Sequence, residues 1–120
     1  MSTATVTRLA GGGNALAPAM GRVDGVGSAA LFKYPMGIAV HADNLFVSEG
    51  SHRIRKVVIS TGEVTTYAGG TSGSPEAFGS ANGLAAVATF YDPQAIAVDG
   101  TGLIVYVADS GNNRIRKIAA

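Results

Sequence analysis

Short apolar runs alternate with short polar, glycine-rich segments along most of the chain. Runs of four to seven residues predict strands over 36–40, 45–48, 53–59, 63–68 and 103–108. No window of useful length shows the 3.6-residue period of an amphipathic helix, so we expect an all-β protein.

The connectors and the strand faces refine this expectation. Asp99-Gly100 stands between two apolar runs, which is a strong signal for a β-hairpin. The run Ile38-Ala39-Val40 and residues 103–108 are apolar at successive positions, so both of their faces are apolar. This pattern is typical of a sheet that is covered on both sides.

The second half of the chain repeats the first. The spacing Phe32-x-x-Pro35 recurs in the second half as Phe90-x-x-Pro93. The sequence Arg-Ile-Arg-Lys at 53–56 recurs at 114–117. Units of about sixty residues with four short strands each are the signature of β-propeller blades, which are four-stranded and antiparallel.

The alignment divides the chain into unit one, residues 2–59, and unit two, residues 60–120. Each unit then holds the fourth strand of one blade followed by the first three strands of the next. These clean repeat boundaries lead us to expect a fragment of a longer propeller or a designed minimal propeller.

Two stretches resemble the NHL repeat. Residues 32–40 (FKYPMGIAV) resemble its opening strand, and residues 107–118 (VADSGNNRIRKI) resemble its most recognisable run. Unit one departs from the pattern because its turn at 49–53 is one residue shorter, and unit two has Ala95 where unit one has Gly37. The resemblance implies a propeller with two blades per chain.

Two blades do not close a propeller, which needs roughly four to eight. Families that resemble this one commonly have six blades, which implies three copies of a two-blade chain. We therefore expect a homotrimer in which residues 5–10 of one copy complete the blade that begins at Gln94 of the next.

Composition excludes several classes of function. The chain has 120 residues, 47% hydrophobic and 14% charged, which predicts a globular domain. No apolar run approaches the roughly 20 residues of a membrane span, and a net charge of +1 gives no basic surface for nucleic acid. We therefore expect neither membrane nor nucleic-acid partners.

Catalytic and cofactor chemistry has little support in the residues. Two histidines, His41 and His52, with no cysteine make a poor set of zinc or copper ligands. The sequence G-x-G-x-x-A at 25–30 matches a dinucleotide fingerprint but lacks the strand before it and the helix after it. We expect no cofactor, no metal and no catalysis.

Two long connectors, 13–31 and 71–89, are the places where a ligand could bind, because long loops are often functional. The candidate binding residues that they carry are Met20, Arg22, Asp24, Phe78 and Asn82, with Glu76 beside them.

In each unit, an acidic residue precedes the turn between the second and third predicted strands, and an arginine follows that turn. They are Asp109 with Arg114 and Glu49 with Arg53, and we expect each pair to be a structural ion pair that fixes its hairpin.

Together these features predict a self-assembling propeller unit that serves as a scaffold or binding module. One alternative is a propeller domain of a longer protein that binds a protein, a peptide or a glycan. A third is a metal-dependent enzyme similar to propeller lyases or lactonases, for which the residues offer the least support.

Overall fold

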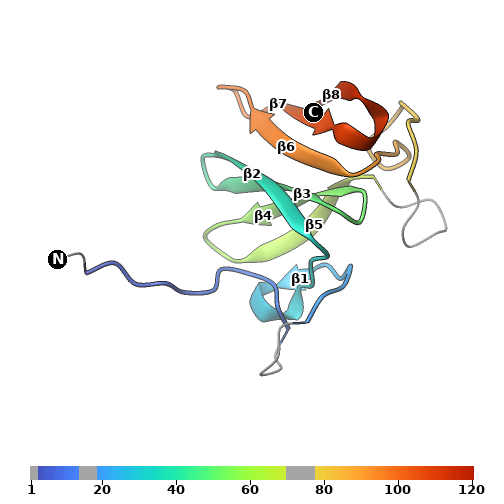
Figure 1. Cartoon of the computed structure of the whole chain (residues 1–120). Helices are drawn as coiled ribbons and strands as arrows, with labels where there is room; N and C mark the ends of the chain where they lie inside the picture. The colour runs from blue at the N-terminus through green and yellow to red at the C-terminus, as the bar shows by residue number, and fades with distance from the viewer. Residues whose placement is uncertain (1–2, 14–18, 70–77) are drawn as a thin grey trace.

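The computed structural model describes residues 3–13, 19–69 and 78–120, and it contains two antiparallel sheets (Figure 1). The strands of the first sheet, in spatial order, are β1 (Gly25–Val26), β5 (Glu63–Ala68), β4 (Arg53–Val58), β3 (Asn44–Glu49) and β2 (Pro35–His41). The second sheet contains β6 (Pro93–Val98), β7 (Ile104–Asp109) and β8 (Arg114–Ala119), in that order. Two short 3₁₀ helices, η1 (Gly27–Ala29) and η2 (Ser110–Asn112), lie in the connectors.

The predicted strands are confirmed to within two residues at each end, and the all-β class with them. The sequence pattern missed β1, because two residues show no periodicity. This strand exists because Gly25 and Val26 pair with Val64 and Glu63 on the outer edge of β5.

The repeat in the sequence is also a repeat in register. In the first sheet Pro35 lies opposite Glu49, and the register shifts by a bulge before the next pairs. In the second sheet Pro93 lies opposite Asp109, and the same shift follows. Strands β3 and β4 therefore match β7 and β8 residue for residue, and residues 35–40 of β2 match β6.

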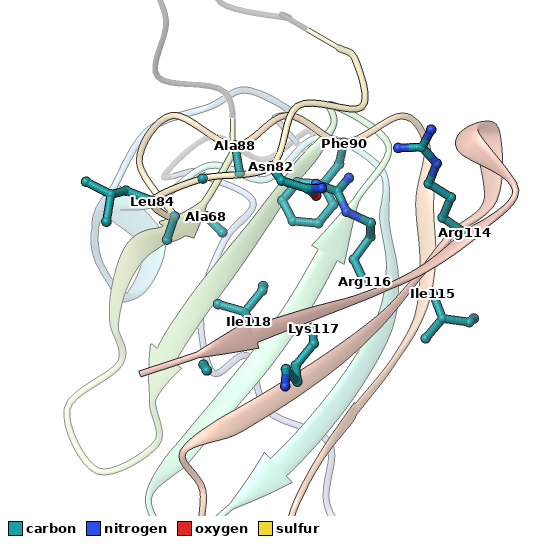
Figure 2. A pocket seen from close by; sticks show the side chains of 13 residues that line it. Ala68, Asn82, Leu84, Ala88, Phe90, Arg114, Ile115, Arg116, Lys117 and Ile118 are labelled. Atoms are coloured by element: carbon teal, nitrogen blue, oxygen red, sulfur yellow. The ribbon is translucent and has the colours of Figure 1, made fainter.

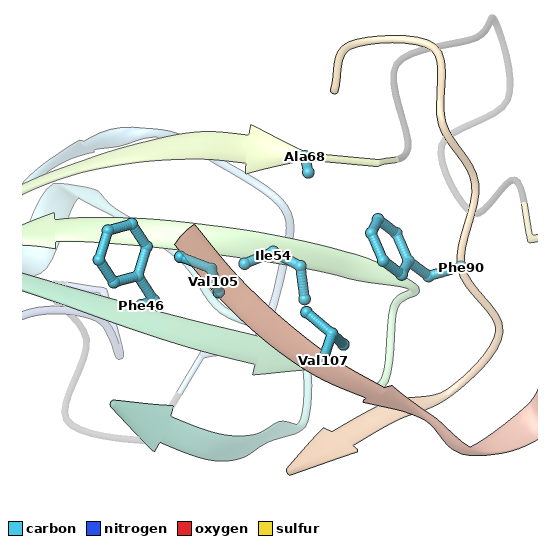
Figure 3. Close-up of a cluster of buried hydrophobic side chains, with 6 residues drawn as sticks. All are labelled: Phe46, Ile54, Ala68, Phe90, Val105 and Val107. Carbon is cyan, nitrogen blue, oxygen red and sulfur yellow. The ribbon is translucent and has the colours of Figure 1, made fainter. Parts of the chain in front are cut away.

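The main hydrophobic core lies between the two sheets (Figure 3). Its buried members come from both sheets and from the segment before β6 (residues 78–92), which we call the second strap. They are Phe46, Ile54, Ala68, Phe90, Val105 and Val107. Because burial of apolar area is the dominant favourable term in folding, this cluster fixes how the sheets stack.

The two sheets approach most closely where β2 passes β6. A Cβ atom built on Gly37 would overlap the carbonyl oxygen of Gln94, so a glycine is required for this approach. The hydroxyl of Ser48 donates to the same Gln94 carbonyl and accepts from the Gly37 amide, at 2.9 Å from that nitrogen. This polar contact ties the backbones of the two sheets together.

The far face of the first sheet is only partly covered. A second cluster of Ala30, Val47, Val57 and Val64 is buried there, at the segment before β2 (residues 19–34), which we call the first strap. The expectation of a sheet covered on both faces thus holds at the centre of the sheet. It is wrong for β2 within this chain, since Ile38 and Val40 are 62% and 59% exposed.

Candidate interaction site

Each sheet holds its preceding strap with a buried acid–arginine clamp. In the first sheet, Arg55 Nη1 lies 2.9 Å from Glu49 Oε1, and both side chains are fully buried. The same guanidinium donates to the carbonyl of Leu31 at 2.9 Å and to Asp24 Oδ1 at 3.0 Å. It also lies 4.8 Å from the centre of the Phe32 ring, a cation–π distance. One arginine therefore fastens the strap to the sheet.

The second sheet repeats this clamp. Arg116 Nη1 lies 2.8 Å from Asp109 Oδ2, and Arg116 also donates to the carbonyl of Thr89 and to Asn82 Oδ1. The sequence predicted Arg114 as the partner of Asp109, and this part of the prediction is wrong. Arg116 is buried, and its Nη1 donates both to the Asp109 carboxylate and to the Thr89 carbonyl, whereas Arg114 is exposed and directs Nη1 to the Ser80 carbonyl at 3.5 Å.

The first sheet carries a second arginine in its clamp. Arg53 Nε lies 3.2 Å from Glu49 Oε2, the pair that the sequence pattern proposed. Burial lowers the pKa of the Arg53 guanidinium, while the Glu49 carboxylate opposes this effect. The Glu49 carboxylate therefore binds two arginines, so its buried negative charge is fully compensated, and Asp24 supplies a second carboxylate to Arg55.

The predicted ligand-binding residues differ in how far their side chains are exposed. Asp24 and Asn82 are counterparts in the repeat, and both are used internally, each as an acceptor for the clamp arginine of its unit. Met20 and Phe78 have side chains that are 61% and 59% exposed. Arg22 is partly buried in the first strap, and Glu76 lies outside the described residues.

Phe78 belongs to a cluster of three rings where the two sheets meet. Its ring centre lies 4.7 Å from that of Tyr91 and 5.5 Å from that of His52. His52 and Tyr91 are also 5.5 Å apart. Tyr91 is 41% exposed, so the cluster presents an aromatic surface at this edge of the molecule.

The two histidines lie at opposite ends of the first sheet, and each contacts the second sheet or its strap. His41 Nε2 lies 3.1 Å from the carbonyl oxygen of Gly100, and His52 Nδ1 accepts from the amide of Asp92 at 2.9 Å. Within the described residues, no group of three or more His, Cys, Asp or Glu side chains is placed to hold a metal ion.

The outer face of the second sheet exposes residues whose counterparts are buried. Phe46 and Ile54 of the first sheet are 3% and 0% exposed, because the second sheet covers them. Their counterparts by register are Tyr106 and Ile115, which are 41% and 76% exposed. This face thus carries the apolar pattern of an inter-sheet contact but has no sheet against it among the described residues.

The outer face of the first sheet shows the complementary pattern. Ile96 and Val98 of β6 pack against the main core, whereas their counterparts Ile38 and Val40 are exposed. A groove of about 220 Å³ lies on this face. It is lined entirely by apolar residues, among them Phe32, Pro35, Ile38, Leu45, Val47 and Val57. The corresponding residues of the second sheet form its half of the main core.

Comparison with known proteins identifies the repeat. Residues 90–118 match the family model of the NHL repeat. The chain is also 33% identical over 101 residues to NHL repeat-containing protein 2 of Bos taurus, an alignment that covers 82% of this chain and 13% of that protein. The chain belongs to the NHL-repeat β-propellers.

Solved structures of similar fold agree with this assignment. An auxiliary nutrient binding protein of Bacteroides thetaiotaomicron superposes with a TM-score of 0.75 at 28% identity, over 91% of this chain and 27% of that one. Another protein of that organism, provisionally named a phosphatase, superposes with a TM-score of 0.73 at 25% identity, over 92% of this chain and 26% of that one.

This NHL chain therefore spans about a quarter of the length of these solved structures and 13% of its curated relative. No helix among the described residues is long and apolar enough to cross a membrane.

Proposed function

We propose that this chain is a self-assembling unit of an NHL-type propeller that acts as a scaffold or binding module. Each sheet is one blade, and copies of the chain stack through their outer faces. One observation carries the proposal. The residues of the two exposed faces are the repeat counterparts of the residues that form the buried junction between the two sheets.

The chemistry of the two faces is complementary. Inside the chain, Phe46 and Ile54 of one sheet pack against Val105 and Val107 of the other. Between chains, Tyr106 and Ile115 of one copy would meet Leu45 and Val47 of the next, together with the exposed Ile38 and Val40. Stacking would remove these large apolar side chains from water, at about 25 cal/mol for each Å² buried.

The geometry of a ring sets the number of copies. The contact is head-to-tail, so it generates a closed ring when the rotations add to a full turn. Six blades require about 60° each, two blades turn about 120°, and three chains complete the circle. The proposed assembly is a homotrimer of three 12.0 kDa chains, 36 kDa in mass, in which an N-terminal strand completes the neighbour's blade.

The junction between copies is expected to be weaker than the junction inside the chain. The inner junction is held by Ser48, His52 and His41, which bond to Gln94, Asp92 and Gly100. The counterparts of these three residues in unit two are Ala108, Asn113 and Asp99, and Ala95 adds a methyl group where Gly37 has none. Dilution should therefore dissociate the ring into folded chains before the chains unfold.

Charged substitutions on the two faces test the proposal. We expect Ile115→Lys and Ile38→Lys each to give folded single chains under conditions where the wild-type chain forms the trimeric ring. Leu103→Lys is the matched control, because Leu103 is 57% exposed but lies in the hairpin between β6 and β7, outside the strands that form the two faces. Equal masses for all three variants and the wild-type chain would contradict stacking through these faces.

A second candidate function is ligand binding at the aromatic cluster, and the exposure of Phe78 and Tyr91 favours it. Aromatic faces bind the apolar faces of sugar rings and of aromatic side chains. A panel of immobilised oligosaccharides and unstructured peptides should retain the wild-type chain and release Phe78→Ala, while Met20→Ala serves as an exposed control. Equal retention of both variants would exclude the cluster as the binding site.

A further inference from the structure

A groove of about 580 Å³ runs along the free edge of β8 (Figure 2). One wall is β8 itself, from Arg114 to Ala119, and the other is the segment 82–85. Phe90, Ala68 and Ala88 also line the groove. Among the described strands, none pairs with this edge of β8, so its backbone groups are available to a further strand.

The first unit shows what fills the corresponding space. There β5 lies between β4 on one side and β1 on the other. In the alignment of the two units, Gly83-Leu84 is the counterpart of Gly25-Val26, the residues of β1. The groove is therefore a slot for one strand, with a pairing partner in place on each side.

The N-terminal segment has the sequence of that strand. In the same alignment, Val6, Thr7 and Ala10 are the counterparts of Val64, Thr65 and Ala68 of β5. Residues 3–9 are exposed and belong to neither sheet, and Val6 is fully exposed.

Gly11, the residue after this segment, makes the same backbone hydrogen bond as its counterpart Gly69. The Gly11 amide donates to the Gly27 carbonyl at 3.0 Å, and the Gly69 amide donates to the Ala85 carbonyl at 3.0 Å. Gly11 contacts Phe32 as Gly69 contacts Phe90. Residues 5–10 thus precede Gly11 as β5 precedes Gly69. They lie on the side of the first sheet that is opposite β8 (Figure 1).

We propose that residues 5–10 of a second copy insert into this groove as an antiparallel strand between β8 and Gly83-Leu84. This proposal rests on the self-assembly proposed above, and it specifies the register. By analogy with the pairs of β5, Val6 lies opposite Ile118, and Ala10 lies opposite Ile115. On the other side, Val6 lies opposite Gly83.

This register gives each apolar side chain an apolar neighbour. Val64 packs with Val47 and Val57, so Val6 would pack with their counterparts Val107 and Ile118 and extend the main core. Tyr67 contacts the Phe46 ring edge-on at 5.0 Å, so Leu9 would lie beside Tyr106.

Cysteine cross-linking tests both the partner and the register, since the chain has no cysteine of its own. In the double variant Val6→Cys/Ile118→Cys, the two thiols lie opposite each other on one face, within reach of a disulfide. The matched control is Val6→Cys/Lys117→Cys, because successive side chains of a strand point to opposite faces. After mild oxidation we expect covalent dimers and trimers from the first variant and unlinked single chains from the second.

The outcomes of the cross-linking experiment distinguish strand insertion from face-to-face stacking of the chains. A native trimer with no disulfide, or with equal linkage in both variants, would overturn the insertion and leave face stacking intact. A disulfide within a single chain would show that the segment fills its own groove, which overturns the role of a second copy. A monomeric wild-type chain would overturn both proposals.

Hydrogen exchange on the unmodified chain provides a test that needs no substitution. Insertion predicts that amides within residues 5–10 exchange at least tenfold more slowly in the trimer than in diluted single chains. Equal exchange rates in the two species would overturn the insertion.

Discussion

Arg116 Nη1 lies 2.8 Å from Asp109 Oδ2, and neither side chain is more than 9% exposed. The same arginine binds the strap before β6 through the Thr89 carbonyl and covers the Phe90 ring at 4.9 Å. Arg55 and Glu49 repeat the arrangement in the first sheet. The clamp is therefore a property of the repeat, and it joins a strap to a sheet.

Arg116→Ala is expected to destabilise the chain by about 3–5 kcal/mol, because it leaves the Asp109 carboxylate buried without its partner. Chemical denaturation at one fixed protein concentration measures this effect. Arg114→Ala is the matched control and should cost about 0–1 kcal/mol, as for an exposed arginine. Equal losses for the two variants would show that Arg116 has no special role.

Gly37→Ala is expected to weaken the contact between the two sheets. The added methyl group would overlap the Gln94 carbonyl, which is backbone and cannot rotate away, so we expect a loss of about 1–3 kcal/mol. Gly100→Ala is the control, because a Cβ atom there meets nothing within 4 Å. Denaturation midpoints that fall equally in both variants would contradict the close approach of β2 and β6.

Arg8→Thr is expected to tighten the assembly. In the first sheet the position opposite Arg55 is Thr66, whose hydroxyl accepts from Arg53 Nη1 at 3.2 Å. The proposed register places Arg8 at that position, beside Arg114 and Arg116, where like charges repel. A dissociation constant measured by dilution should therefore fall in the variant, and a rise would contradict the register.

Asp99 is expected to contribute an acid-sensitive part of the stability. The Thr101 hydroxyl, and then backbone amides such as that of Ile104, donate to its carboxylate and lower its pKa below the ordinary 3.8. The ionised form is thus favoured by folding. Its contribution is present above about pH 3.8 and is lost as the pH falls through the lower folded pKa.

Asp99→Asn should therefore be less stable than the wild-type chain at pH 7, and the difference should shrink as the pH falls below 3.8. Denaturation curves across this range measure the difference. A gap that stays constant with pH would contradict the assignment.

The strands and the repeat could be predicted from sequence because each is encoded locally. Apolar runs such as residues 36–40 and turn residues such as Asp99-Gly100 specify their own conformation. The partner of Asp109 could not be predicted in this way, since Arg114 and Arg116 share a strand face. What selects Arg116 is its reach to the Thr89 carbonyl, a contact between residues that are distant in the sequence.

The open faces were predictable in number but not in composition. Two stacked sheets have two outer faces, whereas the exposure of Ile115 and Ile38 follows from the register of the strands. The slot beside β8 also depends on Gly83-Leu84, and the strand β1 that reveals its role has no signal in the sequence.

The central claim is that copies of this chain close a ring, and the solution mass tests it most directly. Light scattering coupled to size-exclusion chromatography at micromolar concentration should give 36 kDa, three times the 12.0 kDa of one chain. A mass of four chains would keep head-to-tail stacking and replace six blades with eight. A folded, soluble species with the 12.0 kDa mass of one chain at the highest concentration tested would contradict the account.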